Sequence, residues 1–215
     1  MTENVLELLG ALLLLATFRT VATRRLDGYI EAFVQQSVVL AAIAAVVGWA
    51  TGTADLYVVA ALTLVVKAGV IPVILRRVAA ELPTERGVGT LIGPPASIVL
   101  SLLLMGLAFF ATPSVAVSGT LLNEPPLAIS VGIVLIGLLL ISTRRHAVAQ
   151  LVGLLTMENG LFSGAIAIAY GLPLIVEFGI LFDILVAVVV VGLLVTLIGR
   201  EIASTDTSEL TRLKG

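Results

Sequence analysis

The sequence contains no cysteine, one histidine, one tryptophan and few charged residues. Without cysteine, the chain forms no disulfide, binds no metal through thiolates and offers no cysteine nucleophile. Only 12% of its 215 residues are charged, whereas about a quarter of the residues in a soluble domain are charged. A free-standing soluble enzyme, a disordered chain and a coiled coil are therefore excluded. The formal net charge of −2 provides no basic surface for nucleic acid.

Long apolar runs make up most of the chain, which is 59% hydrophobic and has a mean hydropathy of +1.18. A bilayer core about 30 Å thick needs roughly 20 apolar residues per helix. Seven runs approach this length: Val5–Val21, Tyr29–Ala50, Asp55–Leu75, Pro95–Ala111, Leu127–Thr143, Ala147–Tyr170 and Pro173–Gly199. The sequence therefore predicts an all-α, polytopic integral membrane protein with about seven transmembrane helices. The longer connection Arg76–Pro94 has room for a short interfacial helix.

The basic residues predict how the chain is oriented in the membrane. Eleven of the twelve flank the first, third and fifth connections or the C-terminus: Arg19, Arg24, Arg25, Arg76, Arg77, Arg86, Arg144, Arg145, Arg200, Arg212 and Lys214. Cytoplasmic segments of membrane proteins collect lysine and arginine. We therefore expect a multi-pass protein of the cytoplasmic membrane, with its N-terminus outside and its C-terminus in the cytoplasm.

Four charged residues fall inside the predicted spans: Lys67, Glu158, Glu177 and Asp183. A charge at the bilayer centre costs about 2.5–3.5 kcal/mol on insertion scales, whereas one leucine or valine contributes only about 0.3–0.6 kcal/mol in return. Each of these side chains should therefore face protein or water and have a partner.

The depth of these residues follows from their distance to the ends of their spans. At 1.5 Å per residue, Lys67, Glu158 and Asp183 lie about 15–18 Å deep, near the midplane. Glu177 lies about 6 Å below the outer surface, rotated some 120° from Asp183 on the same helix. We expect a midplane layer of one amine and two carboxylates, with a third carboxylate toward the outside.

A proline follows the intramembrane lysine at close range. Pro72 has no backbone N–H, so the helix ladder should be broken near residue 68, one position after Lys67. Irregular helices beside an intramembrane charge are typical of sites that water or ions enter.

Other polar residues accompany the four charges and form the remainder of the candidate site. Asn159 and Ser163 follow Glu158, Gln35 and Gln36 lie in the second span, and Glu31 and His146 lie near the cytoplasmic rim. Such glutamines more often form a hydrogen-bond clamp between helices than line a water path, and the neighbouring arginines favour an ordinary interfacial position for His146.

Two interpretations of the buried charges remain open. Lys67 with Glu158 or Asp183 can be a static ion pair that fixes helix packing. Alternatively, the groups relay protons, because desolvation disfavours their charged forms and makes exchange near neutral pH accessible. The excess of three acids over one lysine, and the level layer that two of these acids form with the lysine, favour proton relay.

Two segments of the C-terminal half carry a resemblance to a known family. They are Leu155–Gly160, which reads LTMENG, and Gly171–Asp183, which reads GLPLIVEFGILFD, before a valine-rich helix that closes at Arg200. The last three spans resemble the K-type subunit of respiratory complex I and the C subunit of multi-subunit sodium/proton antiporters. The whole chain, with four further spans in front, resembles hydrogenase-4 component E of group 4 NiFe hydrogenase and formate hydrogenlyase complexes.

The resemblance implies a division of the chain and a role for its acids. Residues 1–112 would form an N-terminal four-helix part, residues 127–200 a K-like three-helix part and residues 201–215 a cytoplasmic tail. The K-type subunit carries one proton-path acid in its second helix and one in its third. Glu158 takes the first place, and Asp183 or Glu177 takes the second.

The resemblance further implies a membrane subunit of an energy-converting oxidoreductase. Its expected partners are antiporter-like proton-pumping membrane subunits and a hydrogenase-type peripheral arm. With no cysteine, the chain would hold no cofactor, and the NiFe centre and iron–sulfur clusters would belong to partner subunits. A subunit of a cation/proton antiporter without redox partners and a purely structural membrane-arm subunit are the alternatives.

Overall fold

The computed structural model describes residues 2–81, 89–112 and 125–168, all of it helix and short connections. The helices are α1 (Thr2–Ala22), α2 (Leu26–Thr51), α3 (Asp55–Leu62), α4 (Ile71–Glu81), α5 (Pro94–Ala111), α6 (Pro125–Thr143) and α7 (Ala147–Ile168). A π-helix, Thr63–Val70, joins α3 to α4 in one continuous rod. Six helical segments are long and apolar enough to cross a membrane. They confirm the first six predicted spans, and the seventh lies outside the described residues.

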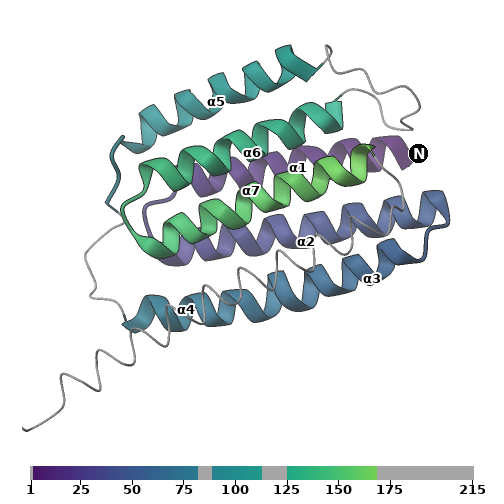
Figure 1. The fold of residues 1–215 in the computed structure, drawn as a ribbon, viewed down its shortest axis with the longest axis horizontal. Coiled ribbons are helices and arrows are strands. Elements are labelled where there is room, and N and C mark those ends of the chain that lie inside the picture. The colour runs from purple at the N-terminus through teal and green to yellow at the C-terminus, as the bar shows by residue number, and fades with distance from the viewer. Residues whose placement is uncertain (1, 82–88, 113–124, 169–215) are drawn as a thin grey trace, which may run out of the picture.

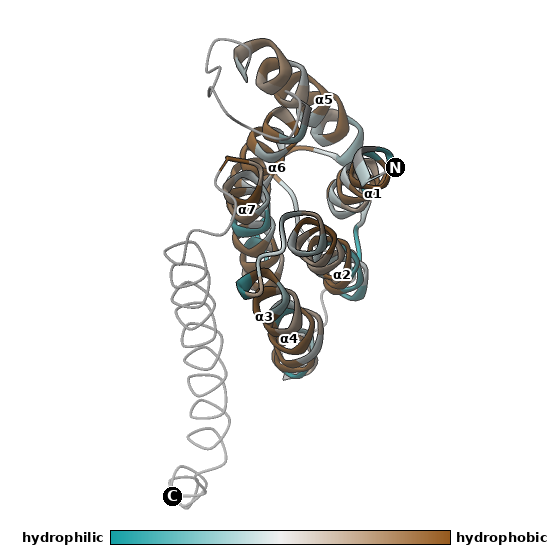
Figure 2. Ribbon diagram, turned by 90° about the vertical axis from the view of Figure 1, so that its right-hand side faces the viewer, coloured by the Kyte–Doolittle hydropathy of each residue, from teal (hydrophilic) through white to brown (hydrophobic). Residues whose placement is uncertain are grey.

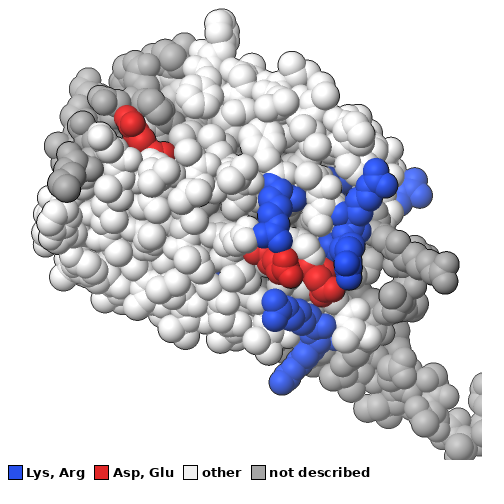
Figure 3. Space-filling view, turned by 180° about the vertical axis from the view of Figure 1, so that it is seen from behind, with Lys and Arg blue, Asp and Glu red and all other residues white. Residues whose placement is uncertain are grey.

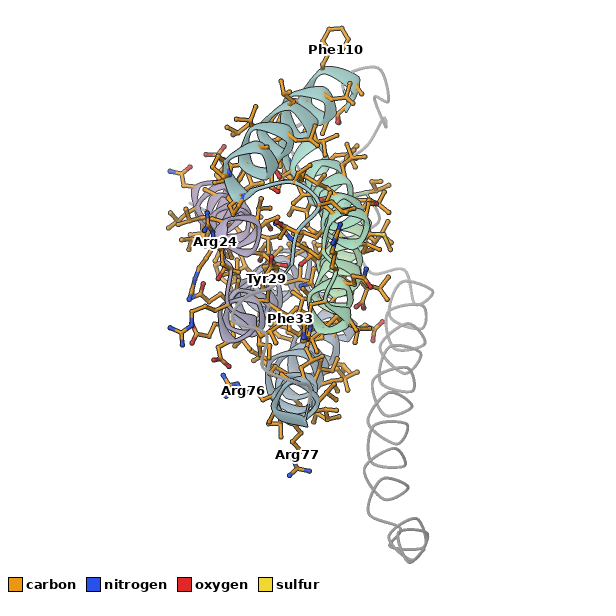
Figure 4. The ribbon with its side chains drawn as sticks, turned by 90° about the vertical axis from the view of Figure 1, so that its left-hand side faces the viewer. Arg24, Tyr29, Phe33, Arg76, Arg77 and Phe110 are labelled. Carbon is orange, nitrogen blue, oxygen red and sulfur yellow. The ribbon has the colours of Figure 1, made fainter. Side chains whose placement is uncertain are left out.

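The third span is longer than the sequence suggested. It was predicted to end at Leu75, but α4 continues to Glu81. The reason is a buried stripe on α4, because Ile71, Leu75 and Val78 are each no more than 1% exposed and pack in one cluster with the start of α2. Residues 76–81 therefore extend the membrane helix and form no separate interfacial helix, while Arg76 and Arg77 point away from the bundle (Figure 4).

Successive helices run antiparallel and pack as two columns (Figures 1 and 2). Seen end-on, α6 and α7 form one column and α1 and α2 the other, with hydrophobic residues over most of the ribbon. Helix α5 lies across one end of the columns against α6 and α1, and the rod of α3, the π-helix and α4 lies across the other against α2 and α7. Helix α2 therefore contacts α1, the π-helix and α7 at once.

One end of the bundle, called the basic end below, holds the connections α1–α2, α4–α5 and α6–α7 (Figure 1). Basic side chains gather there around a few acidic ones (Figure 3). The backbone of Leu91 donates to Thr143 O over 2.8 Å, and that of Arg145 donates to Gly89 O over 2.9 Å, so two of the connections are joined. This grouping matches the predicted positive side, and its assignment to the cytoplasm stays a prediction.

Helix α5 presents an apolar outer face, which suits contact with lipid chains. Phe110 is 83% exposed and points away from the bundle (Figure 4). In contrast, Tyr29 and Phe33 of α2 are fully buried between the helices. The apolar residues of the sequence therefore divide into two sets, one packed in the protein interior and one exposed for contact with the bilayer.

Glycines allow α6 and α7 to approach closely. A Cβ atom on Gly137 would lie 2.6 Å from the backbone nitrogen of Met157, and one on Gly160 would lie 2.8 Å from that of Val134. Small residues at such positions let membrane helices pack backbone to backbone. The contact holds the middle of α7, which carries Glu158, firmly against α6.

Replacing Gly137 by alanine should push α6 and α7 apart and cost about 1–3 kcal/mol, the usual range for overpacking. Gly106 on α5 is the matched control, because a Cβ there would meet nothing within 4 Å. Thermal unfolding of Gly137→Ala and Gly106→Ala in lipid nanodiscs measures the difference. Equal stability of the two variants would contradict the close approach.

Candidate functional site

The centre of the bundle contains a buried ion pair between the rod and α7. Lys67 Nζ lies 2.6 Å from Glu158 Oε1, and the two side chains are only 3% and 5% exposed. The structure thus brings together two of the four charges that the sequence placed inside the membrane. Their part in proton transfer stays a prediction.

Lys67 lies in the π-helix, where the backbone departs from α-helical bonding. The N–H of Ile71 bonds to Val66 O, five residues back instead of four. Pro72, which follows, has no N–H to return the ladder to its usual register at once. The predicted break near residue 68 is confirmed, and its form is an eight-residue π-helix whose buried residues are Thr63 and Lys67. Such segments are rare and occur frequently at functional sites.

A chain of hydrogen bonds continues from Lys67 across three further helices. Lys67 Nζ donates to Asn159 Oδ1 over 3.2 Å, and Asn159 Nδ2 donates to Gln36 Oε1 over 3.4 Å. Gln36 Nε2 donates to Thr20 Oγ1 over 2.9 Å, and the Thr20 hydroxyl donates to Ala16 O over 3.0 Å. Thr20, Gln36 and Asn159 are completely buried. The chain therefore joins the π-helix, α7, α2 and α1 through polar groups sealed from lipid.

The ammonium group of Lys67 also faces an aromatic ring. Its Nζ lies 5.6 Å from the centre of the Phe162 ring, within the range of a cation–π contact. Phe162 follows Glu158 by one helical turn on α7, and Asn159 lies beside Glu158. Three neighbouring positions of α7 thus supply a carboxylate, an amide oxygen and a π-face, all of which stabilise a cation.

The remaining candidates have different positions. Ser163 is buried on α7, one turn beyond Asn159. Gln35 is exposed, so the expectation that it lines the site with Gln36 is wrong, because adjacent helix residues point about 100° apart. Glu177 and Asp183 lie outside the described residues.

The two predicted rim residues both lie at the basic end. Glu31 accepts a 2.6 Å hydrogen bond from Arg19 in an exposed ion pair, with side chains 53% and 41% exposed. His146 lies between α6 and α7, where its Nδ1 accepts the backbone N–H of Val148 over 3.3 Å. This bond is a cap on the first turn of α7, which gives His146 a structural role there.

Arg144 is a buried charge that the sequence reasoning missed. It is 1% exposed, its Nη2 donates to Val21 O over 2.9 Å, and its guanidinium carbon lies 5.8 Å from the centre of the Tyr29 ring. Among the described residues, its Nε and Nη1 have no hydrogen-bond partner. The residue ties the end of α6 to the last turn of α1.

A signal for this burial was present in the helical periodicity. Arg144 follows Leu140 and Ile136 at four-residue steps, and both are fully buried. Extending this stripe past the end of α6 by one turn places position 144 on the inner face and Arg145, which is exposed, off it. The position of both arginines in a short connection does not by itself reveal that Arg144 is buried and Arg145 exposed.

Chemically, the ion pair can hold and exchange a proton but is poorly suited to a metal. Among the described residues, no group of three or more histidine, aspartate or glutamate side chains is placed to hold a metal ion. A carboxylate and an ammonium in a low dielectric attract each other strongly. The amides of Asn159 and Gln36 donate and accept hydrogen bonds without changing charge.

Comparisons with known proteins show which family the chain resembles. A family model described as NADH-ubiquinone/plastoquinone oxidoreductase chain 4L matches residues 125–215. Hydrogenase-4 component E of Escherichia coli K12 is 32% identical over 180 residues, which are 84% of this chain and 83% of that protein. The chain belongs to the hydrogenase-4 component E family. An uncharacterised protein of Mycobacterium tuberculosis is 34% identical over 205 residues, 94% of this chain and 92% of that protein. No solved structure matches the chain.

These findings confirm the family resemblance drawn from the sequence. This member of the component E family is a multi-pass membrane protein whose C-terminal part is related to chain 4L. Glu158 and Asn159 lie in the part that the chain 4L model matches, whereas Lys67, Gln36 and Thr20 lie before it. The site is therefore shared between the two parts of the chain.

Breaking the buried pair from one side should destabilise the protein. Lys67→Met leaves a buried carboxylate without its ammonium and should cost about 3–5 kcal/mol. Glu158→Gln should cost less, because the amide oxygen still accepts from Lys67. The double variant removes both charges and should regain most of the lost stability. Thermal unfolding in nanodiscs measures all three.

The exposed pair at the basic end provides the control. Glu31→Gln breaks an ion pair of the same 2.6 Å length but should change stability by less than about 1 kcal/mol, because water screens it. A double variant at Lys67 and Glu158 that is as unstable as the sum of the single variants would show that the two charges are not coupled.

Proposed function

We propose that this chain is a membrane-arm subunit of an energy-converting, complex I-like oxidoreductase of the group 4 NiFe hydrogenase type. In that complex it contributes part of the path by which protons cross the membrane. Membership of the component E family and the chain 4L match support the assembly. The buried Lys67–Glu158 pair supports the role in proton movement.

The single observation that carries the proposal is a titratable pair buried within membrane-length helices. Glu158 takes up a proton from one side and becomes a neutral carboxylic acid, which breaks the ion pair. Release of a proton toward the other side restores the carboxylate and its attraction to Lys67. Lys67 either stabilises the charged carboxylate throughout this cycle or takes the proton in its turn. One proton enters and one leaves, so the site returns to its starting state.

The proposed path extends beyond the described residues. Asp183 would receive protons laterally at the midplane, and Glu177 would connect this layer toward the outer side. Both assignments rest on counted depth in the sequence and on the family resemblance. Gln36, Asn159 and Ser163 would line the path near Glu158.

Redox chemistry in the proposed complex belongs to other subunits. The sequence has no cysteine to ligate an iron–sulfur cluster, so the NiFe centre and the clusters would lie in a hydrogenase-type peripheral arm. Antiporter-like membrane subunits would lie beside this chain in the bilayer. The chain itself then acts through protonation alone.

A purely structural role is the second candidate, and one observation favours it. The pair is closed at 2.6 Å and almost completely buried, as a static helix clamp would be. The two roles differ in what they require of charge. A clamp needs only that the two side chains balance each other, as two charges or as two neutral groups. Proton movement needs the carboxylate itself.

The neutral double variant Lys67→Met/Glu158→Gln separates the two roles. We expect it to assemble into the complex but to have lost proton translocation, measured with a pH-sensitive dye in vesicles energised by the complex's own electron donor. Wild-type proton movement in this variant would overturn the proposal and establish the structural role. Asp55→Asn, which removes an exposed acid at the start of α3, is the control and should transport normally.

A further inference from the structure

The hydrogen-bond chain that runs from Lys67 to α1 has a defined direction. Thr20 has one hydroxyl proton, and it donates that proton to Ala16 O. Toward Gln36, Thr20 can therefore only accept, so the NH2 group of Gln36 faces Thr20 and its carbonyl faces α7. A hydroxyl on α1 thus decides which end of the Gln36 amide is available to the next residue.

The same logic passes through the next amide. The carbonyl of Gln36 accepts from Asn159, so the NH2 group of Asn159 is used toward α2. Its carbonyl oxygen is left to face Lys67 Nζ. The reverse orientation would set the NH2 group of Asn159 against the ammonium, donor against donor, in a place closed to water.

We propose that Thr20 and Gln36 are positioning residues for Lys67. Acting through Asn159, they present a carbonyl oxygen to the lysine and hold it as a charged ammonium beside Glu158. The hydrogen bonds of Thr20 and Gln36 reach the ion pair through Asn159. This inference rests on the proposed function for its biological meaning, but the orientation of the amides is independent of any transport.

A consequence is that the two members of the pair have different tasks. Neutral amides change charge far less readily than a carboxyl group. The series of hydrogen bonds from Thr20 to Asn159 therefore holds Lys67 in place and does not conduct protons. The ammonium also has Glu158 and the Phe162 ring around it. Lys67 is then the constant positive charge, and Glu158 is the group that exchanges its proton.

The charges around Lys67 agree with this division. On the described helices that pack against the π-helix, Glu158 is the charged group that meets Lys67. The others lie toward the ends of those helices: Asp27 and Glu31 on α2, Asp55 on α3, and Arg76, Arg77 and Glu81 on α4. Variants of Thr20 and Gln36 therefore change the surroundings of Lys67 without altering any charge.

The sequence makes a direct test practical because it contains two lysines, Lys67 and Lys214. In the full chain carrying Lys214→Arg, labelled with ¹⁵N-lysine and placed in lipid nanodiscs, solid-state NMR reports one Nζ signal. Its chemical shift distinguishes an ammonium from a neutral amine. We expect the ammonium signal in this protein at neutral pH.

Two substitutions that keep the shape of the side chain remove the groups that orient the Asn159 amide. Thr20→Val deletes the hydroxyl and Gln36→Met deletes the amide, and both should convert part of the ammonium signal into the amine signal. Thr20→Ser keeps the hydroxyl and should restore the full ammonium signal, which a mere loss of packing would not explain. Gln35→Met, at the exposed neighbouring position, is the matched control.

An unchanged ammonium signal in both Thr20→Val and Gln36→Met would overturn the inference, as would a serine variant that behaves like the valine one. The NMR result stands apart from the transport assay. If Thr20→Val and Gln36→Met lose ammonium signal while Lys67→Met/Glu158→Gln transports protons normally, the positioning role stands and the proposed function falls. If the ammonium signal is unchanged in both variants while Lys67→Met/Glu158→Gln loses proton transport, the proposed function stands and the positioning role falls.

Discussion

The structure depends on the free energy required to keep a charged side chain inside hydrocarbon. Lys67 and Glu158 satisfy this requirement by meeting at 2.6 Å in a place almost closed to solvent. Much of the surrounding structure serves that contact. The π-helix carries the lysine, close packing of α7 on α6 holds the carboxylate, and the buried amide of Asn159 accepts a further hydrogen bond from the ammonium. A buried pair of this kind is stable only when its remaining hydrogen-bonding capacity is also satisfied.

The polar groups around the pair differ in what they can do. A carboxyl group changes charge when it gains a proton, whereas an amide only orients its neighbours. The bundle places one carboxyl group next to a series of amides, and the series ends at a threonine that donates to a carbonyl of its own helix. Order is thus imposed from the backbone of α1, through α2 and α7, on a lysine in the third span.

The membrane class, six of the spans and the two charges of the ion pair could be predicted, because each depends on composition or on residue counting along one helix. The partners of those charges could not. Lys67 and Asn159 are separated by 92 positions, and nothing local specifies their contact. Gln35 and Gln36 were indistinguishable until the packing of α2 turned one inward. Pro72 predicted a disturbed helix but not its π form, and Arg144 was taken for a loop cation because it directly follows the end of α6.

The division of the site between the two parts of the chain has a consequence for how this family is built. The stretch related to chain 4L supplies the acid, and the four preceding helices supply its counter-charge together with the groups that orient it. Within residues 125–168, the basic residues Arg144 and Arg145 follow the end of α6, whereas Glu158 pairs with Lys67 of the third span. The N-terminal helices are therefore more than a spacer, because they bring the cation that compensates the buried acid of the stretch related to chain 4L.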